Sequence, residues 1–230
     1  MLLQLDGYLA IFDHDGVLVD SLECHQQAWL ELERRTRLGL TPEFIHATFG
    51  MTNPSILRRL KGDVLTDDEI QRYSDMKEEC YRDVARGRIA LMDGVRQVLD
   101  GLTAHGVKLA IGSSGPRANL ELTVAECGLS GRFAAIASLE DITRGKPDPQ
   151  VFLVAAAKTG TAATRSIVFE DAPVGIQAAK AAGMYAVGLT TTHPAPSLHE
   201  AGADEVVTNL VGYDVDRLLE RLKARFDRGS

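Results

Sequence analysis

The sequence predicts an α/β fold in which a parallel sheet lies between two layers of helices. Two observations lead to this prediction. Short apolar segments alternate with amphipathic segments along most of the chain, which is the pattern of a parallel sheet covered on both faces. Between residues 21 and 90 the alternation stops and only helical periodicity remains. We therefore expect a three-layer core with a small helical domain inserted into it.

The elements of the core follow one another in strand and helix pairs. Apolar runs predict strands at residues 8–12, 107–112, 133–137, 166–169, 184–189 and 205–207. Apolar residues that recur at three and four positions predict helices at 94–105, 117–127, 149–159, 173–182 and 213–226. A glycine follows four of these helices and is a plausible stop: Gly106, Gly128, Gly160 and Gly183.

The segment after the first strand is predicted to form a separate helical domain. Helical patterns are found at 21–37, 53–60 and 67–85, without a convincing strand between them. A connection between a strand and the next helix normally takes a few residues, so an insertion of this length would lie above the edge where the first strand ends. We predict a core of residues 1–20 and 91–230 and a cap domain of residues 21–90.

Composition and charge limit the classes of function. The 230 residues, 45% of them hydrophobic, can bury a full α/β core with a small extra domain. A formal net charge of −7 argues against a broad nucleic-acid or membrane surface, because such surfaces need clustered Lys and Arg. Three widely spaced cysteines indicate neither disulfides nor a zinc site, and the amino terminus is typical of neither a signal peptide nor a membrane span. We expect a cytoplasmic monomer or weak homodimer that binds a small molecule.

The most informative motif is Asp-His-Asp-Gly at residues 13–16, directly after the first predicted strand. Open parallel sheets carry their chemistry at the carboxyl ends of strands. Asp13 and Asp15 share a face while the chain stays extended, and Gly16 permits a sharp turn after them. One carboxylate could attack an electrophile while the other moves a proton; burying both requires a cation or a hydrogen-bond network. By strand alternation, His14 is predicted to point away from both acids and to be structural.

Three further polar motifs follow later strands. Ser113 and Ser114 precede a helix, so a hydroxyl and backbone N–H groups face the edge that carries the first motif. Lys146 lies in a loop restricted by two prolines and could offer a point charge to a phosphate oxygen and to the attacking carboxylate. Glu170 and Asp171 end another predicted strand. Carboxylates from two strand ends form the hard oxygen environment that Mg²⁺ accepts, and the whole set favours phosphoryl transfer.

These motifs resemble, in order along the chain, the signature of the haloacid dehalogenase-like (HAD) superfamily. The helical insertion is similar to the C1 cap of the subfamily that includes β-phosphoglucomutase and many sugar-phosphate phosphatases. This resemblance implies a Rossmann-like catalytic core and a cofactor, Mg²⁺. It also implies that Asp13 is the nucleophile, Asp15 the acid/base, Ser113 and Lys146 the phosphate-positioning residues, and the Asp13 carboxylate, the Asp15 backbone carbonyl, Glu170 and Asp171 the Mg²⁺ ligands.

The predicted cap also supplies candidate substrate contacts. His25 resembles the cap His of β-phosphoglucomutase-like proteins, and Lys77 matches their cap Lys. Asn53 stands where the mutase has an Arg for its second phosphate. Losing a bidentate Arg should weaken a bisphosphate site substantially, which favours hydrolysis. The candidate substrate-binding residues are Ser114, Arg117, His25, Gly50, Asn53 and Lys77.

These features predict a Mg²⁺-dependent phosphatase that hydrolyses a small phosphorylated metabolite, a sugar phosphate by the resemblance, through an aspartyl phosphate. The alternative is a β-phosphoglucomutase-type phosphomutase. Two other classes of the superfamily fit this sequence less well. A true dehalogenase needs neither Asp15 nor the pair Glu170 and Asp171, and the phosphonate hydrolases usually lack the second Asp. A non-catalytic metabolite-binding protein would be expected to have lost a catalytic acid or the Lys, whereas each is present in this chain.

Overall fold

A computed structural model describes residues 5–48 and 51–227, the last three of them by their backbone alone. The chain forms two compact units. The core unit consists of residues 1–20 and 90–230, and the second unit, here called the helical insertion, consists of residues 21–89.

The core unit is built on one six-stranded sheet in the order β3-β2-β1-β4-β5-β6. Every neighbouring pair of strands is parallel. This architecture confirms the predicted α/β class, because each strand must be joined to the next by a crossover that covers a face of the sheet. The strands are β1 (Leu9–Phe12), β2 (Lys108–Gly112), β3 (Ala135–Ala137), β4 (Ser166–Glu170), β5 (Tyr185–Leu189) and β6 (Glu205–Val207).

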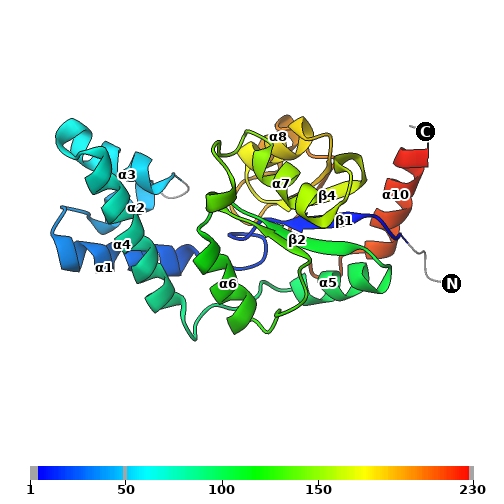
Figure 1. Ribbon diagram of the computed structural model, residues 1–230, viewed down its shortest axis with the longest axis horizontal. Coiled ribbons are helices and arrows are strands. Elements are labelled where there is room, and N and C mark those ends of the chain that lie inside the picture. Colours follow the sequence, from blue (N-terminus) through cyan, green and yellow to red (C-terminus); the bar gives the residue numbers. More distant parts are fainter. Residues whose placement is uncertain (1–4, 49–50, 228–230) are drawn as a thin grey trace. The chain divides into compact units, whose positions relative to one another are not determined.

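Helices cover both faces of this sheet. In Figure 1, α7 and α8 lie on one face and α5 and α6 on the other. The core helices are α5 (Val95–Ala104), α6 (Arg117–Glu126), α7 (Gln150–Thr159), α8 (Pro173–Ala181), α9 (Ala195–Glu200) and α10 (Val215–Asp227), with 3₁₀ turns η2 (Leu139–Asp141) and η3 (Ala163–Arg165). The short helix α9 was not predicted, because six residues give too little periodicity to reveal it.

The core packs most tightly where β1 and β2 meet α7. Leu9, Ile11 and Phe152 are fully buried in one apolar cluster. A Cβ at Gly112 would come within 2.8 Å of Ile11 Cγ2 and 3.0 Å of the Phe152 ring, so only glycine fits there. The sheet pairing continues just past the strand ends, since Asp13 N donates to Phe169 O at 3.0 Å. This packing fixes the carboxyl edge of the sheet, where the predicted catalytic residues of the core unit lie.

The helical insertion consists of α1 (Leu22–Thr36), α2 (Pro42–Ala47), α3 (Asn53–Lys61), η1 (Gly62–Val64) and α4 (Asp67–Ala85). Threonine caps start three of these helices, and Thr66 forms a full capping box with Glu69 at the start of α4. Trp29, Leu32 and Leu57 are buried in an apolar cluster of the insertion itself. The insertion therefore has a hydrophobic core of its own.

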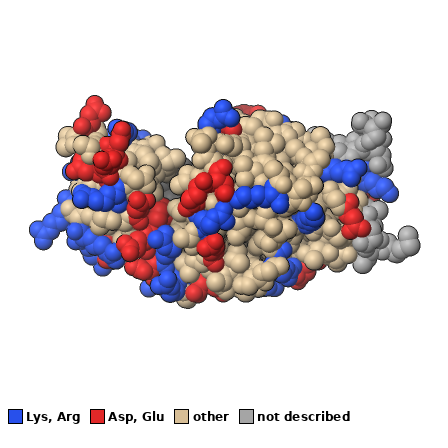
Figure 2. Space-filling view, viewed as in Figure 1, with Lys and Arg blue, Asp and Glu red and all other residues tan. Residues whose placement is uncertain are grey.

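The surface and the helices bear on the predicted partners. On the face shown in Figure 2, Lys and Arg side chains are interspersed with Asp and Glu and do not gather into one basic surface. None of the helices within residues 5–48 and 51–227 combines the length and the apolar character needed to cross a membrane.

Candidate active site

Three buried carboxylates meet at the carboxyl edge of the sheet: Asp13 after β1, and Glu170 and Asp171 at the end of β4. One oxygen from each lies within 4.8 Å of the others. Two glycines make room for them. A Cβ at Gly16 would lie 2.1 Å from Asp171 Oδ2, and one at Gly175 would lie 1.8 Å from Glu170 Oε1. We call Asp13, Glu170 and Asp171 the carboxylate cluster.

The Lys146 ammonium lies between two of these carboxylates. Its Nζ donates to Asp13 Oδ1 at 2.7 Å and to Glu170 Oε1 at 2.5 Å. The predicted contact between the loop lysine and Asp13 is therefore present. Burial alone would lower the pKa of the Lys146 ammonium, but the charges of Asp13 and Glu170 more than offset burial and raise it. Lys146 thus supplies a permanent positive charge beside Asp13.

One ammonium does not compensate three carboxylates. Burial raises the pKa of Asp13 to about 6, with Lys146 opposing the rise and Glu170 adding to it. Burial, followed by the charges of Glu170 and Asp13, raises the pKa of Asp171 to about 8. A hard divalent cation would remove this repulsion, and three carboxylates at one point are the ligand type that Mg²⁺ accepts. The donor set and its excess negative charge fit such a cation.

Asp15 lies two residues after Asp13, on a turn, and its side chain is 39% exposed. Its Oδ1 lies 3.0 Å from His14 Nδ1, so the prediction that His14 points away from both acids is wrong for Asp15. Strand alternation holds only in extended chain, and the extended chain ends at Asp13. Leu18 N and Val19 N both donate to His14 O, which shows that the backbone has already turned at His14.

The serine motif follows β2, the strand beside β1. Ser113 is buried, its backbone N–H donates to Ala137 O at 3.1 Å, and its Oγ accepts from Gly115 N at 3.0 Å. Ser114 is exposed. The structure therefore places Ser113 at the same sheet edge as Asp13, on the neighbouring strand, as the sequence predicted.

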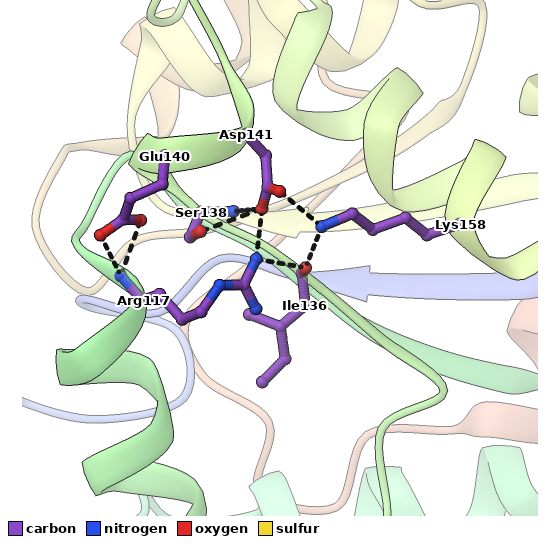
Figure 3. Close-up of polar contacts among 6 residues, drawn as sticks. All are labelled: Arg117, Ile136, Ser138, Glu140, Asp141 and Lys158. Carbon is purple, nitrogen blue, oxygen red and sulfur yellow. Dashed lines mark hydrogen bonds and ion pairs between the residues drawn. The ribbon is translucent and has the colours of Figure 1, made fainter.

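Arg117 belongs to a polar network that joins the start of α6 to β3, η2 and α7 (Figure 3). Its Nη2 donates to Asp141 Oδ2 at 2.5 Å, and its backbone N–H donates to both Glu140 oxygens. Lys158 Nζ reaches Asp141 Oδ1 at 2.7 Å and Ile136 O at 2.9 Å. Burial would raise the pKa of Asp141, but the Lys158 hydrogen bond and its other donors lower it to about 2. Arg117 thus has a structural role, and its predicted contact with substrate stays a prediction.

Sequence reasoning missed the loop after β5, which reaches the carboxylate cluster. Thr192 Oγ1 donates to Asp171 Oδ2, and His193 Nδ1 lies 2.9 Å from Thr192 Oγ1. Thr191 Oγ1 donates to Gly16 O at 2.6 Å. Since β5 is parallel to β4, its carboxyl end lies at the same edge, and that position was the available signal.

The helical insertion contains a polar cluster of its own, formed by His25, Asn53, Lys77 and Glu78 and here called the insertion cluster. Lys77 Nζ lies 2.7 Å from His25 Nδ1 and 2.8 Å from Glu78 Oε1, and Asn53 Nδ2 donates to the same oxygen at 2.7 Å. The His25 ring stacks on Tyr81 with centroids 4.2 Å apart.

The structure thus brings together three of the residues predicted to contact substrate, His25, Asn53 and Lys77. Glu78 was not predicted from the sequence. Burial would raise the pKa of its carboxyl, but the Lys77 ammonium beside it lowers that pKa below its ordinary value. Gly50, another predicted contact, lies outside the described residues.

Known proteins resemble this chain over most of its length. A family model described as haloacid dehalogenase-like hydrolase matches residues 10–189. The validoxylamine A 7'-phosphate phosphatase of Streptomyces hygroscopicus subsp. limoneus is 32% identical, covering 84% of this chain and 90% of its own. The fructose-1-phosphate phosphatase of Escherichia coli (strain K12) is 32% identical, covering 78% and 94%. The β-phosphoglucomutase of Bacillus subtilis (strain 168) is 28% identical, covering 86% and 87%.

A solved structure agrees at the level of the fold. The β-phosphoglucomutase from Clostridium difficile superimposes with a TM-score of 0.80 at 22% identity, covering 96% of this chain and 99% of that one. The chain belongs to the haloacid dehalogenase-like hydrolases. Its named relatives are phosphatases and a phosphomutase.

Proposed function

We propose that this protein is a Mg²⁺-dependent phosphatase that hydrolyses a small phosphorylated metabolite, a sugar phosphate, through an aspartyl phosphate on Asp13. The observation that carries the proposal is the contact of Asp13 with Lys146 inside a cluster that holds two further buried carboxylates. A nucleophilic carboxylate must stay ionised next to an anionic phosphate, and a fixed ammonium at 2.7 Å favours its ionised form.

Each residue of the core site has a role in this reaction. Asp13 attacks phosphorus, and the bond to the leaving oxygen breaks as Asp15 gives that oxygen a proton. Asp15 then takes a proton from the water that attacks the aspartyl phosphate, so that Asp13 is restored and inorganic phosphate leaves. Ser113 and Lys146 hold phosphoryl oxygens. Mg²⁺, held by Asp13, Glu170, Asp171 and the Asp15 carbonyl, would draw negative charge from the transferring group.

The insertion cluster supports hydrolysis of a monophosphate over a mutase reaction. A phosphomutase must hold a second phosphate, which calls for an additional cation. In the described part of the insertion cluster, the Lys77 ammonium is paired with Glu78, and Asn53 is neutral. We propose that His25, Asn53 and Lys77 contact the hydroxyl groups of the substrate. Gly50, Ser114 and Arg117 stay proposed contacts.

The mutase remains the second candidate because a β-phosphoglucomutase is among the relatives. Phosphate release separates the two. Wild type and Asp13→Asn would be incubated with a sugar-phosphate panel that includes fructose 1-phosphate and β-glucose 1-phosphate, with Mg²⁺ and with chelator. Chelator-sensitive release by wild type alone supports the phosphatase. Formation of glucose 6-phosphate without release would establish the mutase, and no turnover of any member would contradict both.

A further inference from the structure

His14 lies between the two acids of the first motif and has polar partners on both sides of its ring. Its Nδ1 lies 3.0 Å from Asp15 Oδ1, and its Nε2 lies 2.7 Å from Thr123 Oγ1. His14 is 1% exposed and Thr123 is fully buried in α6. The ring therefore links helix α6 of the core unit to the carboxylate of Asp15.

Packing restrains the Asp15 side chain less than it restrains the carboxylate cluster. Asp13, Glu170 and Asp171 are buried and held by the packing around them, whereas the Asp15 side chain is 39% exposed on a turn. A proton-transfer group must be held within a fraction of an ångström of its productive position. A buried ring anchored at its far nitrogen restricts the rotation of the carboxylate that it contacts.

The composition of this contact favours a role beyond filling space. An apolar side chain could occupy the same buried volume without needing a partner. A buried imidazole is costly unless its nitrogens are hydrogen-bonded, so the histidine requires Thr123 behind it. The imidazole makes a directed contact with Asp15, which an apolar side chain could not make.

We propose that His14, held by Thr123, is a positioning residue that orients the Asp15 carboxylate for proton transfer. This inference rests on the proposed function, in which Asp15 protonates the leaving oxygen. If His14 has this role, the loss of activity on replacing it depends on the leaving group of the substrate. Phenolate is a stronger base than p-nitrophenolate and needs a proton as it leaves, whereas p-nitrophenolate leaves without one.

The test compares kcat/KM for phenyl phosphate and p-nitrophenyl phosphate, since this constant covers the steps through the first breaking of the ester bond. His14→Phe is expected to lower kcat/KM for phenyl phosphate about 10- to 100-fold and to change the value for p-nitrophenyl phosphate much less. Asp15→Asn is expected to show the same pattern with a larger loss. Thr123→Val should lower the ratio of kcat/KM for phenyl phosphate to kcat/KM for p-nitrophenyl phosphate. Thr123→Ser, which keeps the hydroxyl, should restore this ratio.

Thr159→Val serves as the matched control, because Thr159 is also a buried helical threonine whose hydroxyl is hydrogen-bonded, to Ala156 O. It should leave the ratio of the two constants unchanged. Thr123→Val retains the imidazole but removes its anchor, and it remains informative if His14→Phe does not fold. An unchanged ratio in folded His14→Phe or Thr123→Val, with active wild type, would overturn the positioning role alone. Wild type inactive on both esters and on the sugar-phosphate panel would overturn the proposed function and this inference with it.

Discussion

The carboxylate cluster of the core unit and the pair of Lys77 and Glu78 in the insertion cluster are both buried, yet their charges are balanced differently. The core cluster sets three carboxylates against the single ammonium of Lys146. In the insertion cluster, the Lys77 ammonium faces the single carboxylate of Glu78. The first cluster therefore carries an excess of negative charge that a further cation would offset, whereas the second pairs one ammonium with one carboxylate.

The pKa directions of the two clusters follow from this difference. Burial raises the pKa of Asp13 to about 6 and that of Asp171 to about 8, because one lysine cannot offset the acids around it. Burial acts in the same direction on Glu78, yet its pKa is lowered, because the Lys77 ammonium beside it and the Asn53 amide stabilise its ionised form. Burial alone therefore does not decide the direction of a carboxyl's pKa shift. The number of groups that stabilise its ionised form also decides it.

Removing the attacking carboxylate should have the largest effect. Asp13→Asn is expected to lower phosphate release by at least about 10³-fold, because the amide cannot form the acyl phosphate. The thermal transition of the variant should stay close to that of wild type, since the substitution keeps the size of the side chain. Circular dichroism checks the fold, and a near-normal rate in folded Asp13→Asn would remove Asp13 as the nucleophile.

Removing one uncompensated charge should stabilise the metal-free protein. The pKa of Asp171 lies above its ordinary value, so keeping Asp171 ionised disfavours the folded state increasingly as the pH rises toward about 8. Asp171→Asn should raise the free energy of unfolding at pH 8 in chelator by about 1–3 kcal/mol and abolish the stabilisation by Mg²⁺. Urea denaturation checks both effects, with Asp100→Asn, an exposed acid outside the cluster, as control. A destabilised Asp171→Asn in chelator would contradict the excess of charge.

Breaking the balanced pair should destabilise the insertion. Lys77→Met leaves the buried Glu78 carboxylate without its ammonium, and we expect a loss of about 2–3 kcal/mol in the free energy of unfolding. The double variant Lys77→Met/Glu78→Gln removes both charges and should recover part of that loss. Chemical denaturation of the single and double variants measures the coupling. Additive losses would show that the two charges do not compensate each other.

A smaller effect is expected at the network of Figure 3. The pKa of Asp141 is lowered to about 2, so its contribution to stability is complete above its ordinary pKa near 3.8 and is lost as the pH falls toward 2. Asp141→Asn should cost about 1–2 kcal/mol at pH 7. The difference from wild type in urea denaturation should shrink below about pH 4. A difference that stays constant down to pH 3 would show that the Asp141 charge does not contribute.

Most of the core site could be predicted because it depends on regular geometry. Parallel strands end at one edge, so Asp13, Ser113 and Glu170 could be assigned to a common place from the apolar runs that precede them. The contact of Lys146 with Asp13, which spans 133 positions, followed from the same topology and from the chemistry of phosphate.

The residues that escaped prediction lie where the chain is not regular or where partners come from another element. His14 is on a turn, so strand alternation gave the wrong direction for its ring. Thr192 contacts Asp171 from a loop that carries no motif. The Asp141 partner of Arg117 lies on a short 3₁₀ turn, and Glu78 is recognisable only once Asn53 and Lys77 are seen to meet at one of its oxygens.

The most direct test of the charge excess is the number of protons released when Mg²⁺ binds, measured by titration calorimetry in buffers of different ionisation enthalpy. A carboxyl with a pKa of about 8 is mostly protonated at pH 7 and must lose its proton to become a ligand. The account predicts release of close to one proton at pH 7 and of about a tenth of a proton at pH 9, with loss of the release in Asp171→Asn. Mg²⁺ binding without proton release at pH 7, or no binding at all, would contradict it.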